Sequence, residues 1–382
     1  MSETFDSLVL LCHCLGQGSA TDRIAPLRKR LEAGAADWAE MIRIADQHLL
    51  IPALSRALTD KGLDDVVPKD LREFLRKGYQ LNCIRNERIK AQGEEIVKRL
   101  NALGVTPLML KGGVHLFEVA PEDIGRRMMV DLDILVPDGK LDAAVRVLED
   151  LGYAIVGDPL GWTYQYPPMR RDGDPAAIEL HRAVGEQQAV LTVDAAWRDA
   201  VPLPVEGYDL LSLSPTHRVL HNAFHAQIQD RAHVLGQFAL KDLYDVVMIR
   251  GRHEDAIDWA AARDAMRAQG LSAVLNAHLY QVAQLMGVPM PAAIPATLGA
   301  RFHLRRCILQ ARRPGLRSLF GYWGAVTHPF KRYNIELLYG EAGNALTLNA
   351  YRLKHALHLM RKFRGNIFQE IEKTRATHYD AG

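Results

Sequence analysis

Two aspartates one residue apart, Asp131 and Asp133, lie in the otherwise apolar segment 130–136. On a β-strand, successive side chains point to opposite faces, so both carboxylates would project together while Leu132 and Ile134 pack behind them. Carboxylates held this close repel each other unless a cation lies between them, and hard divalent cations prefer oxygen ligands of this kind. The spacing therefore predicts a metal site, although a solvated strand face can carry the same pattern.

A third carboxylate and a glycine turn favour the metal site over the solvated face. Glu179 is flanked by apolar residues in a second strand-like segment. The turn formed by Lys111, Gly112 and Gly113 follows the short apolar segment 105–110, so the backbone can lie close to a ligand there. A glycine turn, a carboxylate pair and a later acidic strand form the layout of a two-metal phosphoryl-transfer site.

Together these residues resemble the bacterial family of uncharacterised nucleotidyltransferases, within the nucleotidyltransferase superfamily and its polymerase-beta-like core. The shared motifs are Leu110-Lys111-Gly112, Arg126 or Arg127, Asp131-Leu132-Asp133 and Glu179-Leu180-His181. The resemblance extends more weakly from about Trp38 to about Val247. The chain departs from the superfamily in two ways: Gly113 stands where the turn usually has serine, and the gap from this turn to the carboxylate pair is longer than usual.

The resemblance implies an enzyme, a magnesium-dependent nucleotidyltransferase that binds ATP or another NTP. It would transfer a nucleoside monophosphate to a hydroxyl acceptor and release pyrophosphate. Asp131 and Asp133 would hold one or two Mg²⁺ or Mn²⁺ ions, and Glu179 would complete the second metal site and help to deprotonate the acceptor. His181 would either orient Glu179 or a metal-bound water, or only cap the end of its strand.

A further set of residues is expected to bind the nucleotide. Backbone N–H groups of Gly112 and Gly113 would point to phosphate, and Lys111 would supply a point charge. Arg126 or Arg127 would offer a planar fork to phosphate oxygens, unless the two arginines lie in a solvated loop.

Three charged residues further along resemble a basic and acidic signature in the helical domain of the same family: Lys241, Asp242 and Asp245. By that analogy Lys241 and Asp242 bind the nucleotide and close over its base or ribose. A salt-bridged contact between domains explains these residues equally well. Histidines 217, 221 and 225 recur on one helical face and could ligate a metal, but no glutamate follows the first of them as in a zincin helix, so packing is favoured.

The expected fold class is α+β, a small mixed β-sheet core with a helical N-terminal part and a larger helical C-terminal part. The expected domains are an N-terminal helical domain (1–103), the nucleotidyltransferase core (104–210), a helical domain (211–300) and a basic helical segment (301–382). Within the core, the patterns predict a helix over 141–151 and strands over 153–156, 162–166 and 178–182. The segments 201–204 and 211–215 read as a linker, and helices follow over 216–229, 234–250, 256–269 and 271–286.

Composition indicates a folded, cytoplasmic protein. The chain has 382 residues, 48% of them hydrophobic, which suffices for large cores. No apolar stretch is long enough to span a bilayer, and no basic residue precedes the apolar run at the N-terminus, which makes it a poor secretory signal. The four cysteines form no spaced pairs, which favours a reducing compartment.

Charge is distributed unevenly along the chain. Residues 301–366 carry a net charge of +11 while the whole chain carries +2, so the remainder is −9. Aromatic residues are interleaved with the basic ones, which suits an anionic partner such as RNA, a nucleotide sugar or lipid, or a membrane surface. An amphipathic helix over 346–363 with its arginines in solvent is the competing interpretation. The acceptor is therefore an RNA end or a small hydroxyl metabolite, antibiotic or peptide, and the oligomeric state is open.

Two other functions fit parts of the pattern. A glycosyltransferase could use Asp131 and Asp133 to hold the metal of a nucleotide sugar, but such enzymes usually build a nucleotide-binding α/β half before this motif, and here the preceding residues look helical. A non-catalytic nucleotide- or nucleic-acid-binding protein on a degenerate transferase scaffold would explain Gly113. The presence of all three carboxylates argues against lost chemistry.

Overall fold

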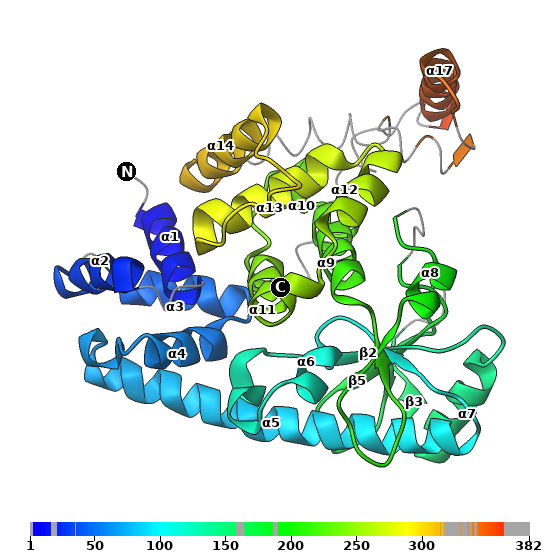
Figure 1. The fold of residues 1–382 in the computed structure, drawn as a ribbon, viewed down its shortest axis with the longest axis horizontal. Coiled ribbons are helices and arrows are strands. Elements are labelled where there is room, and N and C mark those ends of the chain that lie inside the picture. The colour runs from blue at the N-terminus through cyan, green and yellow to red at the C-terminus, as the bar shows by residue number, and fades with distance from the viewer. Residues whose placement is uncertain are drawn as a thin grey trace.

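The computed structural model describes residues 3–16, 21–34, 36–157, 164–185, 190–313 and 342–362, together with residues 315, 316, 330, 335, 338 and 339. Over these residues the fold is mostly helical and contains one seven-stranded mixed sheet, which confirms the expected α+β class. Figure 1 shows the long helix α5 (Lys69–Ala102) running beneath both the N-terminal helices and the sheet.

The N-terminal helices are α1 (Glu3–Leu15), α2 (Thr21–Glu32), α3 (Trp38–Gln47), α4 (Ile51–Asp60) and α5, with a 3₁₀ turn, η1 (Asp64–Val66), before α5. Three of them, α3, α4 and α5, start at a capping residue or a proline. The side chain of Asp37 accepts a hydrogen bond from the N–H of Glu40 at 3.0 Å and so caps α3. Pro52 lies in the first turn of α4, where its missing N–H leaves no partner unsatisfied. Helices α3 and α4 therefore belong to the helical N-terminal part that the sequence predicts.

The two strands that carry the acidic residues are neighbours at the centre of the sheet. The strands are β1 (Leu108–Met109), β2 (Asp131–Leu135), β3 (Ala154–Ile155), β4 (Met169–Arg170), β5 (Ala177–His181), β6 (Val201–Pro202) and β7 (Leu211–Ser212). Their order is β3-β4-β5-β2-β1-β7-β6. Strand β2 pairs in parallel with β5 and antiparallel with β1.

One face of the sheet is covered by α5 and α7 (Leu141–Asp150). Leu132 and Ile134 of β2 pack there with Ile89 of α5 and Leu148 of α7 in one fully buried apolar cluster. Because alternate residues of a strand face opposite ways, the two aspartates of β2 point to the other face. One face of the sheet is therefore packed against helices, and the other face carries the acidic residues.

The expected linker over 201–204 and 211–215 is wrong, because both stretches contribute strands. Strand β7 pairs in parallel with β1 through Leu211 and Leu108, and β6 pairs with β7 at the outer edge. Pro202 cannot donate a main-chain hydrogen bond, but an edge strand tolerates this loss.

The remaining helices lie between the strands in the chain or follow the last strand. They are α6 (Gly113–Glu118), η2 (Pro121–Arg126), α8 (Val193–Arg198), α9 (Pro215–Phe224), η3 (His225–Gln229), α10 (Ala232–Leu235), α11 (Leu240–His253), η4 (Glu254–Ala256), α12 (Trp259–Ala268), α13 (Ser272–Met286), α14 (Leu298–Arg312) and α17 (Ala345–Lys362). Of these, α6 and η2 pack against α5. Two of the observed helices differ from the helices that the sequence predicts. The one over 216–229 ends in a π-helical turn, η3, and the one over 234–250 is interrupted at Gly236, whose φ of 66° is left-handed.

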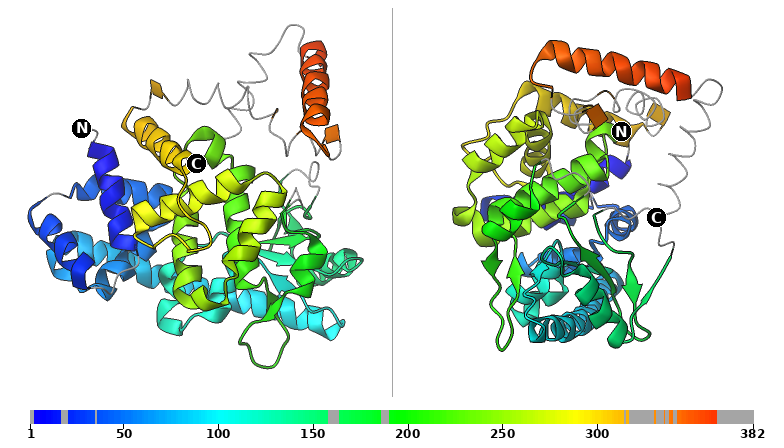
Figure 2. Two further views of the ribbon diagram at one scale, coloured as in Figure 1. Left: turned by 45° about the horizontal axis from the view of Figure 1, so that its top comes forward. Right: turned by 90° about the vertical axis from the view of Figure 1, so that its right-hand side faces the viewer.

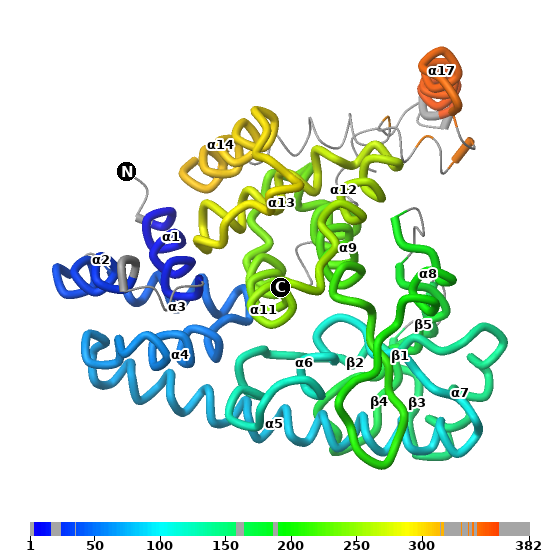
Figure 3. Tube along the Cα trace, viewed as in Figure 1, coloured from blue at the N-terminus to red at the C-terminus, as the bar shows by residue number. Residues whose placement is uncertain are grey.

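The N-terminal and C-terminal helices share one apolar core. Leu11 of α1, Leu54 of α4, Leu243 of α11 and Leu275 of α13 are fully buried members of the same cluster. Figures 2 and 3 show the first helices of the chain beside α13 and α14. The boundaries of the four domains expected from the sequence remain predictions.

Two expected features fall partly outside the described residues. The helix expected over 346–363 is present as α17, which stands apart from the helices over the sheet in Figures 1 and 2. Most residues between α14 and α17 are not described, so the anionic partner of the stretch 301–366 remains a prediction. The start of the strand expected over 162–166 also lies outside them. None of the helices in the described ranges has the length and apolarity that crossing a bilayer requires.

Candidate active site

Strand pairing brings the three predicted carboxylates together. In the parallel ladder of β2 and β5, Asp133 lies directly opposite Glu179. Asp131 is two residues earlier on β2 and therefore shares their face of the sheet. The N–H of Leu110 donates to the main-chain oxygen of Asp133 at 2.9 Å, so the glycine turn leaves the sheet beside the carboxylates.

Asp133 is buried and receives two hydrogen bonds on a single oxygen. Lys111 Nζ lies 2.6 Å from Asp133 Oδ1, and His181 Nε2 lies 2.9 Å from the same atom. The side chain of Asp133 is only 3% exposed, and that of His181 is fully buried. Glu179 is more accessible, and its Oε2 accepts a hydrogen bond from Gln165 Nε2 at 3.0 Å. The core of the site is therefore a lysine–aspartate–histidine cluster beside a glutamate.

The carboxylates influence one another's protonation. Burial and the neighbouring charge of Asp133 raise the pKa of Asp131 and that of Glu179. Burial would raise the pKa of Asp133 too, but the charge of Lys111 and the hydrogen bond from His181 hold that pKa well below its usual range. Burial also opposes the charged form of Lys111, yet the carboxylate of Asp133 outweighs it and raises the lysine pKa. Three carboxylates thus share one ammonium group.

This set of donor atoms fits a hard divalent cation. One donor atom each from Asp133, Glu179 and His181 lie within 4.8 Å of one another, the one such cluster among the described residues. Since Nε2 of His181 donates its hydrogen to Asp133, the carboxylates are the available ligands, and they are the oxygen donors that Mg²⁺ prefers. Asp131 lies outside the trio, and its metal role remains a prediction.

Both glycines of the turn are required by close contacts. A Cβ atom at Gly112 would overlap the guanidinium of Arg127, and one at Gly113 would overlap the thioether of Met109. Met109 is fully buried and cannot easily move. The methionine therefore accounts for glycine in place of serine at 113. The backbone of Lys111 has a φ of 44°, a left-handed conformation that residues other than glycine rarely adopt.

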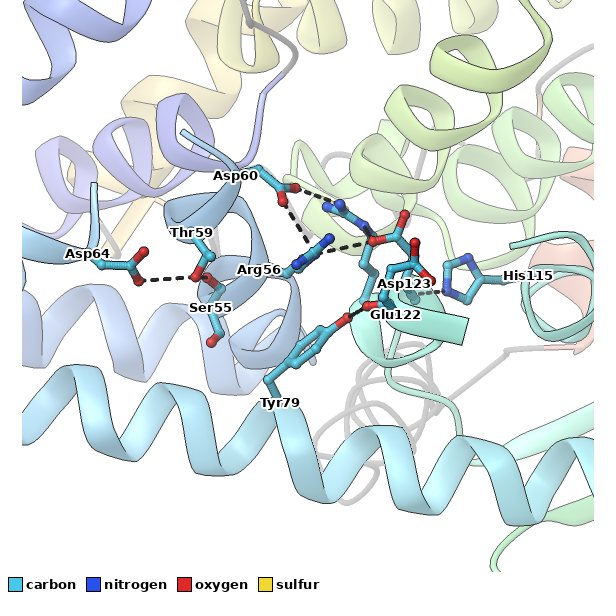
Figure 4. A network of polar contacts seen from close by, with 10 residues as sticks. Ser55, Arg56, Thr59, Asp60, Asp64, Tyr79, His115, Glu122 and Asp123 are labelled. Carbon is cyan, nitrogen blue, oxygen red and sulfur yellow. Dashed lines mark hydrogen bonds and ion pairs between the residues drawn. The ribbon is translucent and has the colours of Figure 1, made fainter. Parts of the chain in front are cut away.

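The two adjacent arginines have different partners, and neither lies in a solvated loop. Arg127 donates from Nε and Nη2 to the two carboxylate oxygens of Asp245 on α11, at 2.9 Å each, and lines a cleft. Arg126 donates from Nε to Asp123 at 2.9 Å and also binds Asp60. Figure 4 shows Asp60 and Asp123 in a polar network that joins α4 to η2. Arg127 is thus at the site, whereas Arg126 fastens the N-terminal helices to the core.

The cleft lies between the glycine turn and the helices α9 and α11. It has a volume of about 90 Å³ and opens to solvent at its mouth. The helical wall contributes Arg218, His221, Asn222, His225, Lys241, Asp242 and Met248. Lys241 and Asp242 therefore line the same cleft as the glycine turn, and their binding of a nucleotide there remains a prediction. Asp245 forms a salt bridge with Arg127 between the core and the helices. A contact of this kind was the alternative interpretation of Lys241, Asp242 and Asp245.

Burial changes the ionisation of the helical wall. Burial and the charge of Asp245 raise the pKa of Asp242 to about 6. Burial and His225 lower the pKa of His221 well below its usual value, so the imidazole is neutral. His217 lies 3.6 Å from Asp199. The one group of possible metal ligands found in the described ranges contains none of His217, His221 and His225.

A family model described as an uncharacterised nucleotidyltransferase matches residues 34–287 of the chain. The chain belongs to this family. Membership confirms the resemblance predicted from the motifs and makes the protein an enzyme of nucleotidyl transfer, with an NTP as the substrate that the family implies. A comparison with curated proteins found no match.

Part of the cleft of this nucleotidyltransferase is formed by residues that no motif indicated. Glu118 accepts hydrogen bonds at 2.7 Å from both terminal nitrogens of Arg218, and His253 Nε2 lies 3.0 Å from the same carboxylate. His278 Nε2 lies 2.9 Å from Asn222 Oδ1. Glu118, Arg218 and Asn222 line the cleft but follow no recognisable spacing in the sequence, so only the fold brings them together.

Proposed function

We propose that this nucleotidyltransferase requires Mg²⁺ or Mn²⁺ and transfers a nucleoside monophosphate from an NTP to a hydroxyl acceptor, with release of pyrophosphate. The observation that supports it most is the pairing of Asp133 with Glu179 on adjacent parallel strands, beside the glycine turn and its cleft. Positioning and charge neutralisation are what phosphoryl transfer demands of a protein.

The three carboxylates have separate tasks in this mechanism. Asp131, Asp133 and Glu179 would hold the metal, which when bound neutralises phosphate oxygens and acidifies the acceptor hydroxyl. The acceptor oxygen bonds to the α-phosphorus while the bond from that phosphorus to the β-phosphate oxygen breaks, so pyrophosphate leaves. Glu179 takes the acceptor proton, a role that its raised pKa supports, and Gln165 orients its carboxylate.

The cationic residues at the turn bind the triphosphate. Arg127 uses Nε and Nη2 on Asp245, which leaves Nη1 for a phosphate oxygen. The N–H groups of Gly112 and Gly113 belong to the start of α6, and Lys111 lines the same cleft. Lys241 and Asp242 would contact the nucleoside.

The alternatives receive less support. Family membership disfavours a glycosyltransferase, and Gly113 is explained by the packing of Met109 without any loss of activity. We place the protein in the cytoplasm, which its four free cysteines support. The acceptor is an RNA end, a small hydroxyl metabolite or a peptide, and the charge of residues 301–366 favours an anionic one.

Calorimetric titration with ATP, GTP, CTP and UTP in the presence of Mg²⁺ tests the proposal. Wild-type protein should bind at least one NTP, and Asp131→Asn/Asp133→Asn should lose the metal-dependent part of that binding. The matched control is Asp172→Asn/Asp255→Asn, which removes two exposed carboxylates elsewhere and should bind as the wild type does. Absence of NTP binding with both Mg²⁺ and Mn²⁺ would overturn the proposal.

A further inference from the structure

Lys111 lies between the acidic cluster and the cleft. Its Nζ lies 2.6 Å from Asp133 Oδ1, and the charges of Glu179 and Asp131 also act on it. The same side chain lines the cleft together with Gly112 and Arg127. One ammonium group therefore stands between the carboxylates and the space proposed for the triphosphate.

The oxygen that Lys111 contacts has no room for another cation. A carboxylate oxygen has two lone pairs, and Oδ1 of Asp133 already faces Lys111 and His181. A divalent ion on this oxygen would also lie against the ammonium group, and in a buried site that repulsion is poorly screened. A metal that binds Asp133 through Oδ1 must therefore displace Lys111.

Displacement is unfavourable unless Lys111 receives a new partner. The lysine is three-quarters covered, so an ammonium group moved off Asp133 without a replacement would lose its ion pair in a partly desolvated place. Triphosphate oxygens in the cleft supply that replacement. The left-handed backbone at Lys111 and the steric limit at Gly112 fix the base of the side chain, so the exchange requires rotation of the side chain alone.

We propose that Lys111 occupies the metal position of the free enzyme, and that the divalent cation enters together with the triphosphate, whose oxygens take Lys111 away from Asp133. This inference rests on the proposed function and adds the order in which its ligands bind. Metal and triphosphate are then coupled ligands, each raising the affinity for the other, and couplings of this kind are typically about 5- to 150-fold.

Binding of Mn²⁺ alone, followed by electron paramagnetic resonance of the free ion, tests the inference without any turnover. Wild-type protein should bind Mn²⁺ weakly, and Lys111→Met should bind it at least tenfold more tightly. The control is Lys241→Met, which removes an equal charge from the same cleft but has no hydrogen bond to Asp133, and its effect should be much smaller. Thermal unfolding checks that each variant folds, and Lys111→Gln replaces the methionine variant if that one does not.

The outcomes separate this inference from the proposed function. If Lys111→Met binds Mn²⁺ no more tightly than wild type while wild type still binds an NTP through the two aspartates, Lys111 does not hold the metal position. If neither protein binds Mn²⁺ or a metal–NTP complex, both proposals fail. If wild type binds Mn²⁺ equally tightly with and without an NTP, the coupling is absent and the inference is overturned.

Discussion

The acidic site of the core takes its charged residues from one turn and two adjacent strands, whereas the helical wall of the cleft comes from segments far along the chain, mainly α9 and α11. The core side has three carboxylates and one ammonium group. Across the cleft, the ion pairs Arg127–Asp245 and Arg218–Glu118 each join a residue of the core to a residue of α9 or α11. The excess of carboxylates in the core favours the binding of a cation, whereas the neutral ion pairs hold the helices in position against the core.

The largest effect should follow from Asp133→Asn, which removes the residue at the centre of the acidic side. The change deletes a metal ligand and the partner of both Lys111 and His181. We expect kcat to fall by about 1000-fold, the scale of losing a group that stabilises transition-state charge. Pyrophosphate release is the measurement, with Asp172→Asn as the control. A decrease of less than tenfold would mean that the acidic side is not the catalytic one.

A smaller effect should follow from Gly113→Ser, which introduces the superfamily's usual turn residue. The new Cβ overlaps Met109, and such overpacking lowers the free energy of unfolding by about 1–3 kcal/mol. Urea unfolding of Gly113→Ser, Met109→Ala and the double variant measures this. Serine should cost less in the Met109→Ala background, because the overlapping thioether is gone. Additive effects would show that the methionine is not the reason for the glycine.

Arg127→Lys tests the connection between the two sides. Lysine keeps the charge but loses the planar fork that binds Asp245, so we expect the KM for NTP to rise about tenfold. Arg126→Lys is the matched control, because it alters the adjacent arginine, whose partners are Asp123 and Asp60. The control should lower the unfolding midpoint and leave KM unchanged. Equal KM effects in the two variants would place Arg126 at the cleft as well.

At Asp242 the expected effect is confined to stability and depends on pH. Burial and Asp245 raise its pKa from 3.8 to about 6, so between these values the folded protein binds the proton more readily than the unfolded chain does. The free energy of unfolding therefore falls as pH rises through this range. Asp242→Asn should be more stable than wild type by up to about 3 kcal/mol above pH ~6.5, and this gain should disappear as pH falls below ~4. Urea titrations at several pH values measure it, and a pH-independent difference would contradict the raised pKa.

The acidic side could be predicted because its information is local. Asp131 and Asp133 sit at strand spacing, and the glycines follow an apolar segment directly, so periodicity and turn chemistry suffice. The sequence could not tell which of two adjacent arginines faces the cleft, because that depends on where α11 lies. The same holds for Glu118 and Asn222, whose partners are distant in the chain.

The strands β6 and β7 were missed for a related reason. Each has two residues, and neither shows alternation long enough to count as a strand. Leu211 becomes part of the sheet only because its N–H donates to the main-chain oxygen of Pro107, about a hundred positions earlier. Pairings of this kind are decided by tertiary contacts, which override local preference.

The core shared by the first and last helices has a consequence during protein synthesis. Leu11 and Leu54 are buried against residues of α11, α13 and α14, including Leu304. Roughly 250 residues must therefore leave the ribosome after Leu54 before this core can close, which takes on the order of 10–60 s at ordinary elongation rates. Until then the apolar faces of α1 and α4 lack their partners, so the N-terminal third of the chain depends on late-synthesised helices to complete its folding.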